Sequence, residues 1–176
     1  MADREDIVER LNFYGLAMDT RRWDLFDQIF LPFAAVDYGP GSCWSELGAF
    51  KDAFGAFHAL FDATQHMMSN HLVRVEGNSA FSMTYGQWRL IRHAAGDPPV
   101  WDGSGYYDDE WTRTPDGWRI VRRTCRVIYW TGNPRVQTPS EDLEFKLDLV
   151  ALHKEADGGR VSVLGKGAPS SSNILG

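Results

Sequence analysis

Asp19 is the first residue whose type and position could support proton-transfer chemistry. It ends an amphipathic segment and is followed by Thr20, Arg21 and Arg22. A carboxylate at the C-terminal end of a helix is disfavoured by the helix dipole, so a buried Asp19 needs a cation or a hydrogen-bond donor beside it. One interpretation is a turn residue that faces Arg21 or Arg22, and the other is a carboxylate that supports a histidine.

Among the five histidines, His66 is the best placed to be that partner. It stands in Thr-Gln-His-Met-Met, a polar ring among apolar neighbours where the chain is expected to enter a sheet. Such a histidine is either a satisfied structural residue or a general base, and the residues alone leave both open. We expect His58 to be solvated, His93 to lie in a loop and His153 to belong to the C-terminal segment. His71 either lines a pocket or stacks on the outer face of the sheet.

No pattern for a metal or a phosphate group occurs in the sequence. There is no HxH or HExxH, and Cys43 and Cys125 form no CxxC pair. The nucleotide-binding loops GxGxxG and GxxxxGK[ST] are also absent. Gly103-Ser104-Gly105 lies in a strand-like segment, where a bulge or a close backbone approach explains it better than phosphate binding. We therefore expect no metal and no organic cofactor.

The composition is that of one globular domain rich in aromatic rings. The 176 residues are 43% apolar and 24% charged, which suffices for a hydrophobic core that needs no stabilising cross-links. Seven Trp, six Tyr and ten Phe could line a pocket for a small hydrophobic or aromatic ligand. The net charge of −6 argues against nucleic acid as a partner. Without a signal-peptide core or a membrane-length apolar run, we expect a cytoplasmic protein with no membrane partner.

Elements with helical spacing come first along the chain. Apolar residues three and four positions apart predict helices over residues 3–18, 23–30 and 47–61, the second of which Pro32 stops. Residues 33–38 are typical of a strand that ends at a Gly-Pro-Gly turn.

The spacing then changes to a period of two. Residues 71–75 and 81–87 alternate on either side of a Gly-Asn turn, and residues 101–113 and 118–130 form a long hairpin. Helices followed by an antiparallel sheet indicate the α+β class.

A C-terminal extension follows the main domain, which we assign to residues 1–132. Within residues 133–176, Ser140 is expected to cap a helix that runs to about Glu155. A Gly- and Ser-rich tail after it is expected to pack on the same domain or on a neighbouring subunit.

The order of these elements and several local patterns resemble the SnoaL-like branch of the nuclear transport factor 2-like superfamily. The patterns are Tyr14-Gly-Leu-Ala-Met-Asp19 with Arg22-Trp23-Asp24, Val36-Asp37-Tyr38, Thr64-Gln65-His66-Met-Met-Ser-Asn70 and Asp116-Gly117-Trp118-Arg119-Ile120. The resemblance implies a cone-shaped α+β barrel, in which a strongly curved, mostly antiparallel sheet wraps around the N-terminal helices and leaves one deep apolar cavity.

The same resemblance implies an activity. Relatives include scytalone dehydratase, bile acid dehydratase, lindane dehydrochlorinase, polyketide cyclases and small subunits of aromatic-ring dioxygenases. In the dehydratases an aspartate and a histidine form a dyad, and Asp19 and His66 match these positions. This predicts a cofactor-independent lyase of the dehydratase type, a homodimer or homotrimer acting on a small hydrophobic, aromatic or polycyclic molecule. The alternatives are a polyketide cyclase or isomerase, and a non-catalytic ligand-binding protein or dioxygenase small subunit.

Further site residues follow from the resemblance. Tyr14 and Tyr38 match tyrosines of the dehydratases, where their hydroxyls either donate to a substrate oxygen or bond to the backbone. Expected substrate contacts are Trp23, Phe54, Phe57, His71, Tyr106, Arg123 and Arg126. Gly105 departs from the pattern, since scytalone dehydratase has a second catalytic histidine there, and Val127 replaces an asparagine or arginine. The groups that could substitute are Asp102, Ser104, Tyr106, Arg123 and Arg126, and alternation alone leaves open which of them point inward.

Overall fold

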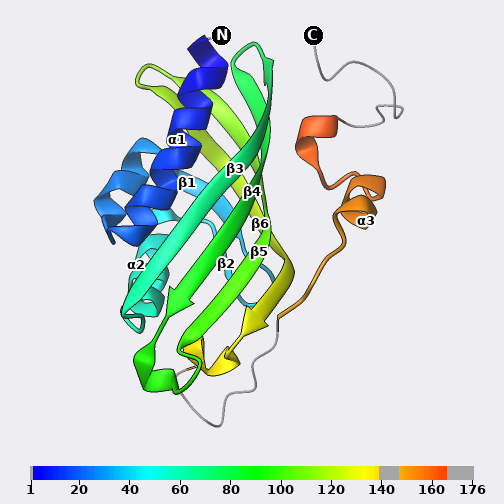
Figure 1. Cartoon of the computed structure of the whole chain (residues 1–176). Helices are drawn as coiled ribbons and strands as arrows, with labels where there is room; N and C mark the ends of the chain where they lie inside the picture. Colours follow the sequence, from blue (N-terminus) through cyan, green and yellow to red (C-terminus); the bar gives the residue numbers. More distant parts are fainter. Residues whose placement is uncertain (1, 139–146, 166–176) are drawn as a thin grey trace.

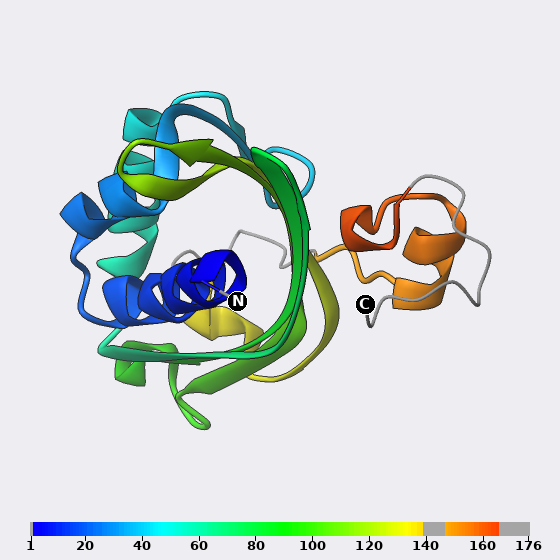
Figure 2. The ribbon, with the colours of Figure 1, turned by 90° about the horizontal axis from the view of Figure 1, so that it is seen from above.

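The computed structural model describes residues 2–138 and 147–165. Its centre is a six-stranded sheet in the order β2-β1-β6-β5-β4-β3, which curves around the N-terminal helices (Figures 1 and 2). The neighbours from β3 to β6 pair antiparallel, whereas β1 pairs parallel with β6. The α+β class is thereby confirmed, but the sheet is not closed into a barrel, because β2 and β3 do not pair with each other.

The described part of the chain contains three α-helices and six strands. The helices and strands are α1 (Ala2–Asp19), β1 (Phe30–Asp37), β2 (Cys43–Trp44), α2 (Leu47–His58), β3 (Ala63–Glu76), β4 (Ser79–Ile91), β5 (Val100–Thr114), β6 (Gly117–Gly132) and α3 (Leu152–Asp157). Short 3-10 helices cover Trp23–Gln28, His93–Ala95, Pro134–Val136 and Ser162–Leu164. Within the described ranges, no helix is both long and apolar enough to cross a membrane.

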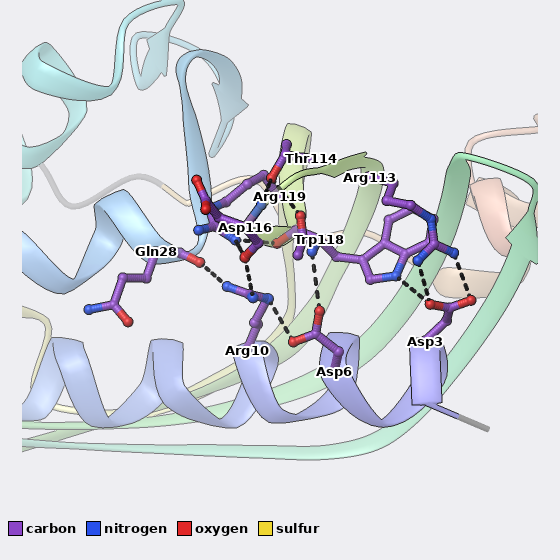
Figure 3. A network of polar contacts seen from close by, with 10 residues as sticks. Asp3, Asp6, Arg10, Gln28, Arg113, Thr114, Asp116, Trp118 and Arg119 are labelled. Carbon is purple, nitrogen blue, oxygen red and sulfur yellow. Dashed lines mark hydrogen bonds and ion pairs between the residues drawn. The ribbon is translucent and has the colours of Figure 1, made fainter.

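Helix α1 lies in the concave face of the sheet and packs mainly on β3. A polar network fixes its N-terminal end to the hairpin between β5 and β6 (Figure 3). Asp3 accepts two hydrogen bonds of 2.7 Å from Arg113 and one from the indole of Trp118, and these donors lower the pKa of Asp3 to about 2. Asp6 binds Arg10 and the backbone N–H of Trp118. Acidic side chains also complement the positive end of the helix dipole, so the first turn holds α1 in place.

The predicted short helix at residues 23–30 is wrong only at its C-terminal end. The 3-10 helix ends at Gln28, and β1 begins at Phe30 and runs through Pro32. Pro32 is tolerated because the ladder between β1 and β6 is interrupted between Phe30 and Ala35, and β2 pairs only with the end of β1. A proline costs nothing where no ladder hydrogen bond needs its N–H group.

Among the described residues of the C-terminal extension, the 3-10 helix at Ser162–Leu164 packs on the outer face of the sheet (Figure 2). Val161 and Val163 form a small cluster there with Met83 and Tyr106. The predicted helix from Ser140 starts outside the described residues, and residues 147–151 are not helical. Instead the chain at Leu149 forms a parallel bridge to Val127 of β6, and α3 starts only at Leu152.

Candidate active site

Asp19 and His66 form a partly buried pair where the end of α1 meets β3. An oxygen of Asp19 lies 2.7 Å from Nδ1 of His66, and the other oxygen accepts the backbone N–H of His66 at 2.8 Å. The hydroxyl of Thr64 donates to the first oxygen at 2.8 Å. The side chain of His66 is 4% exposed and that of Asp19 is 25% exposed, so the carboxylate lies nearer the surface. Three donors therefore hold the carboxylate in one orientation.

This geometry sets the charge and the tautomer of the pair. Burial would raise the pKa of Asp19, but the hydrogen bonds from His66 and Thr64 outweigh it, and the pKa is lowered. An ionised carboxylate can only accept, so Nδ1 of His66 carries a proton. In neutral His66 the lone pair is then on Nε2, and none of the hydrogen bonds found in the described part of the chain uses that atom. The arrangement is that of a general base with an orienting carboxylate.

The interpretation of Asp19 as a surface turn residue is excluded. Arg22 forms a two-point ion pair with Asp24, with distances of 2.9 and 2.7 Å. Arg21 adopts a left-handed backbone conformation with φ of 54° and donates to the carbonyl of Phe61 at 2.6 Å. Both arginines thus have other partners, which leaves the carboxylate of Asp19 to the histidine.

The expectation that His58 is solvated is wrong. Its ring is 2% exposed at the end of α2 and lies 6.0 Å from the ring of His66, centre to centre. The rings of Trp23 and Phe54 contact the ring of His58, with centre-to-centre distances of 5.1 and 5.4 Å. Burial lowers the pKa of His58 to about 4, so this histidine is neutral at physiological pH. Spacing could have revealed it, because His58 follows Phe50 and Phe54 at intervals of four.

Tyr14 and Tyr38 lie together in a second polar cluster. Their hydroxyl oxygens are 2.5 Å apart, and Phe54 packs against the ring of Tyr38 at 5.1 Å. Burial raises the pKa of Tyr14 to about 12 and that of Tyr38 well above its ordinary value. Both phenols are therefore protonated at neutral pH. Since one hydroxyl donates to the other, one O–H remains to bind a further acceptor.

Arg123 lies against the ring of Tyr14 and is fully buried. It forms a two-point ion pair with Asp109, with distances of 2.7 and 2.8 Å. Its guanidinium lies 4.2 Å from the ring centre of Tyr14 and 4.5 Å from that of Tyr107. The predicted substrate contact at Arg123 thus faces inward but is enclosed by rings and by its carboxylate.

Four of the proposed replacement groups lie on the outer face of the sheet. Tyr106 of β5 and Arg126 of β6 are opposite each other in the strand pairing, and Val161 and Val163 of the C-terminal extension pack against Tyr106. Arg126 binds Asp37 at 2.7 Å. Asp102 pairs with Arg89, and Ser104 lines an outer-face depression of about 390 Å³. The structure therefore places Tyr106 and Arg126 on the side opposite to His66, so they are not ligand contacts of this pair.

The remaining predicted substrate contacts are Trp23, Phe57 and His71. Trp23 and Phe57 both touch the ring of His58 and are half-buried. His71 is held by Thr84 at 3.0 Å and by Asn12 of α1 at 3.1 Å. His71 thus lies on the inner face, where it joins α1 to the sheet.

The two departures from the dehydratase pattern lie directly opposite each other. Gly105 of β5 pairs with Val127 of β6 beside a bulge. A Cβ atom at Gly105 would overlap the carbonyl oxygen of Arg126 and would lie 2.8 Å from the ring of Trp88. No histidine can stand at Gly105 in this backbone. The indole of Trp88 occupies that space and donates to the hydroxyl of Tyr107 at 2.7 Å.

Three contributors to this site were missed by the sequence interpretation. Thr64 was noted only as part of a pattern, Asp109 was not considered, and His58 was assigned to the surface. Among the described residues, no group of three or more His, Cys, Asp or Glu side chains is arranged to hold a metal ion. An open cavity beside Asp19 and His66 remains a prediction.

Comparison with known proteins identifies the family of this chain. The SnoaL-like domain family matches residues 1–124. An uncharacterized protein of Mycobacterium tuberculosis is 34% identical over 124 residues, which are 70% of this chain and 84% of that protein. A crystal structure from Kribbella flavida superposes with a TM-score of 0.72 and 25% identity, covering 78% of this chain and 98% of that one.

A scytalone dehydratase candidate from Novosphingobium aromaticivorans superposes with a TM-score of 0.67, covering 85% of this chain and 96% of that one. It is 19% identical, so this likeness shows the fold alone. Neighbours with the same fold include a protein of the nuclear transport factor 2-like superfamily. The match over residues 1–124, which is more than half of the chain, shows that the chain belongs to the SnoaL-like family.

Proposed function

We propose that this protein is a cofactor-independent lyase that removes water from a small hydrophobic molecule, aromatic or polycyclic in character. One observation carries the proposal: Asp19 fixes the Nδ1–H tautomer of His66 and leaves Nε2 as an acceptor. A neutral imidazole removes a proton from carbon only where a neighbouring group stabilises the carbanion. The substrate class that meets this need is a β-hydroxy carbonyl compound attached to an aromatic ring.

In the proposed reaction, Nε2 of His66 takes the proton from the carbon next to the carbonyl. The electron pair of that C–H bond first forms the enolate and then the C=C bond, while the C–O bond to the hydroxyl breaks. The departing hydroxide takes up the proton held by His66, so the products are the unsaturated carbonyl compound and water. Asp19 stabilises the imidazolium that exists between these two proton transfers.

Tyr14 and Tyr38 supply the second function in this proposal. An O–H of the pair would donate to the oxygen that gains negative charge, as an oxyanion hole does. Support comes from the raised pKa values of both phenols, which keep them protonated as donors. The fold is also that of a scytalone dehydratase candidate, a likeness that agrees with elimination of water.

The test is turnover of a panel of aryl β-hydroxy ketones, followed by the absorbance of the conjugated product and by mass spectrometry. We expect the wild type to release water and His66→Ala to lose at least about 100-fold in rate. His93→Ala is the matched control, because His93 forms a similar pair with Asp62 at 2.9 Å but is 74% exposed. Unchanged turnover in His66→Ala would refute the mechanism. A product with the mass of the substrate would favour an isomerase or cyclase instead.

A further inference from the structure

His58 is the one buried histidine close to His66, and the proposed elimination does not use it. It comes from the last turn of α2, whereas His66 comes from β3. The two rings lie 6.0 Å apart at an angle of 34°. A molecule of two fused rings that reaches His66 is therefore large enough to reach His58 as well.

The proton of His58 can be placed from its hydrogen bond. Nδ1 lies 2.8 Å from the carbonyl oxygen of Phe54, one turn earlier in α2. A carbonyl oxygen only accepts, so Nδ1 carries the proton. Because the ring is neutral, Nε2 carries a lone pair and is an acceptor.

Nε2 of His58 is buried and has no hydrogen-bond partner among the described residues. A buried acceptor without a donor destabilises the fold relative to one that is satisfied. The ring is otherwise surrounded by Trp23, Phe54, Phe57 and Phe61, where an apolar side chain would avoid this cost. A buried acceptor without a partner calls for an explanation, and a ligand beside His66 that donates a hydrogen bond to it would supply one.

We infer that His58 is a specificity-determining residue, whose Nε2 accepts a hydrogen bond from a hydroxyl group on an aromatic ring of the substrate. This inference rests on the site of the proposed function and narrows its substrate class to phenols. It assigns the second histidine of the site to α2, since the backbone at Gly105 leaves no space for one on β5. The surrounding rings would contact the apolar part of the same molecule.

The inference is tested by binding alone, with three probes: 2-naphthol, 2-methoxynaphthalene and naphthalene. Isothermal titration calorimetry on the full chain should show that the wild type binds 2-naphthol at least about tenfold more tightly than either other probe, which corresponds to about 1.4 kcal/mol. In His58→Phe this preference should fall below about threefold, because the ring remains and the acceptor is lost. In His58→Gln the side-chain oxygen stands near the position of Nε2, so the preference should be retained.

The tautomer is checked separately on protein labelled with ¹⁵N-histidine. The Nε2 resonance of His58 should be that of an unprotonated nitrogen, and it should shift when 2-naphthol is added but not when naphthalene is added. Equal affinities for the three probes, no binding of any of them, a preference that survives His58→Phe, or a proton on Nε2 would each overturn the inference.

These outcomes are independent of the proposed elimination. His66→Ala should keep the preference for 2-naphthol even though it is expected to lose turnover. If His66→Ala turns over normally while His58→Phe loses the preference, the elimination mechanism fails and the role of His58 stands. If the reverse is found, the role of His58 fails and the mechanism stands.

Discussion

Gly15 of α1 lies directly against His66 of β3. A Cβ atom at this glycine would stand 3.3 Å from the carbonyl oxygen of His66 and 3.3 Å from Cγ of Met68. The absence of a side chain therefore lets the helix approach the strand at the residue that carries the proposed base. One turn later, the same helix ends in Asp19 and delivers the carboxylate to the imidazole.

Gly15→Ala is expected to lower the activity without a comparable loss of stability. Alanine favours a helix over glycine by about 1 kcal/mol, which offsets the cost of the close contact. The helix must shift by a few tenths of an ångström, and Asp19 shifts with it relative to His66. Turnover and thermal unfolding should be measured together. Gly48→Ala in α2 is the control, since nothing lies within 4 Å of its Cβ position, and it should leave turnover unchanged.

Asp19→Asn should reduce the rate of the proposed reaction by at least about 100-fold while the fold is kept. The backbone N–H of His66 requires an acceptor, so the amide oxygen takes that side. The amide NH₂ then faces Nδ1 of His66, which must accept, and the proton moves to Nε2. ¹⁵N shifts of His66 should report this exchange of tautomer. An Nδ1–H tautomer with full activity in Asp19→Asn would contradict the assignment.

Removal of Arg123 should act on folding. Arg123→Met leaves the carboxylate of Asp109 buried without its partner, and we expect a loss of about 3–5 kcal/mol in the free energy of unfolding. The double substitution Arg123→Met with Asp109→Leu should recover most of this loss, because no charge is then buried. Urea denaturation of the single and double variants measures both values. A single variant with wild-type stability and impaired ligand binding would instead support the substrate contact predicted from the sequence.

Asp108 makes the stability of the protein depend on pH, and its contribution falls as the pH rises, which is the reverse of the usual effect of an aspartate. It accepts hydrogen bonds from the N–H and hydroxyl of Ser162, at 2.9 and 2.7 Å. Burial nonetheless raises the pKa of Asp108 from 3.8 to about 6. The folded state thus binds this proton more tightly than the unfolded state, and stability falls as pH rises from about 4 to about 6.

Asp108→Asn removes this titration and keeps an acceptor and a donor for Ser162. Relative to the wild type, the variant should therefore gain up to about 3 kcal/mol in unfolding free energy between pH 4 and pH 7. Urea denaturation of both proteins at the two pH values cancels the contributions of all other groups. A difference that does not change with pH would show that Asp108 does not titrate in this range.

Local patterns predicted much of the fold. The stripe of α1 is confirmed, since Ile7, Leu11, Tyr14 and Met18 are all buried. The Gly-Asn turn connects β3 to β4, and the long hairpin pairs Arg113 with Trp118 as its turn requires. Helix spacing and turn chemistry act between residues close in the chain, so these features can be predicted without knowledge of the rest.

The face to which a strand residue points was less predictable, because bulges reverse the alternation. His66 and His71 are five positions apart, which would place them on opposite faces of a regular strand. A register shift between Ser69 and Leu72, with φ of 52° at Asn70, brings both onto the inner face. A further shift, where Ser104 pairs with Tyr129 but Gly105 pairs with Val127, leaves an extra residue in β6 and breaks the alternation in that strand.

The sequence by itself determined the α+β class, the family and the two residues most suited to proton transfer, because composition, periodicity and ordered motifs carry this information locally. Only the tertiary structure decided that Asp19 faces His66, that His58 is buried beside them, and that Arg126 points away. The physical reason is that these placements depend on register shifts and on the packing of α1 and α2 against distant strands. Such contacts join residues far apart in the chain, and no local pattern records them.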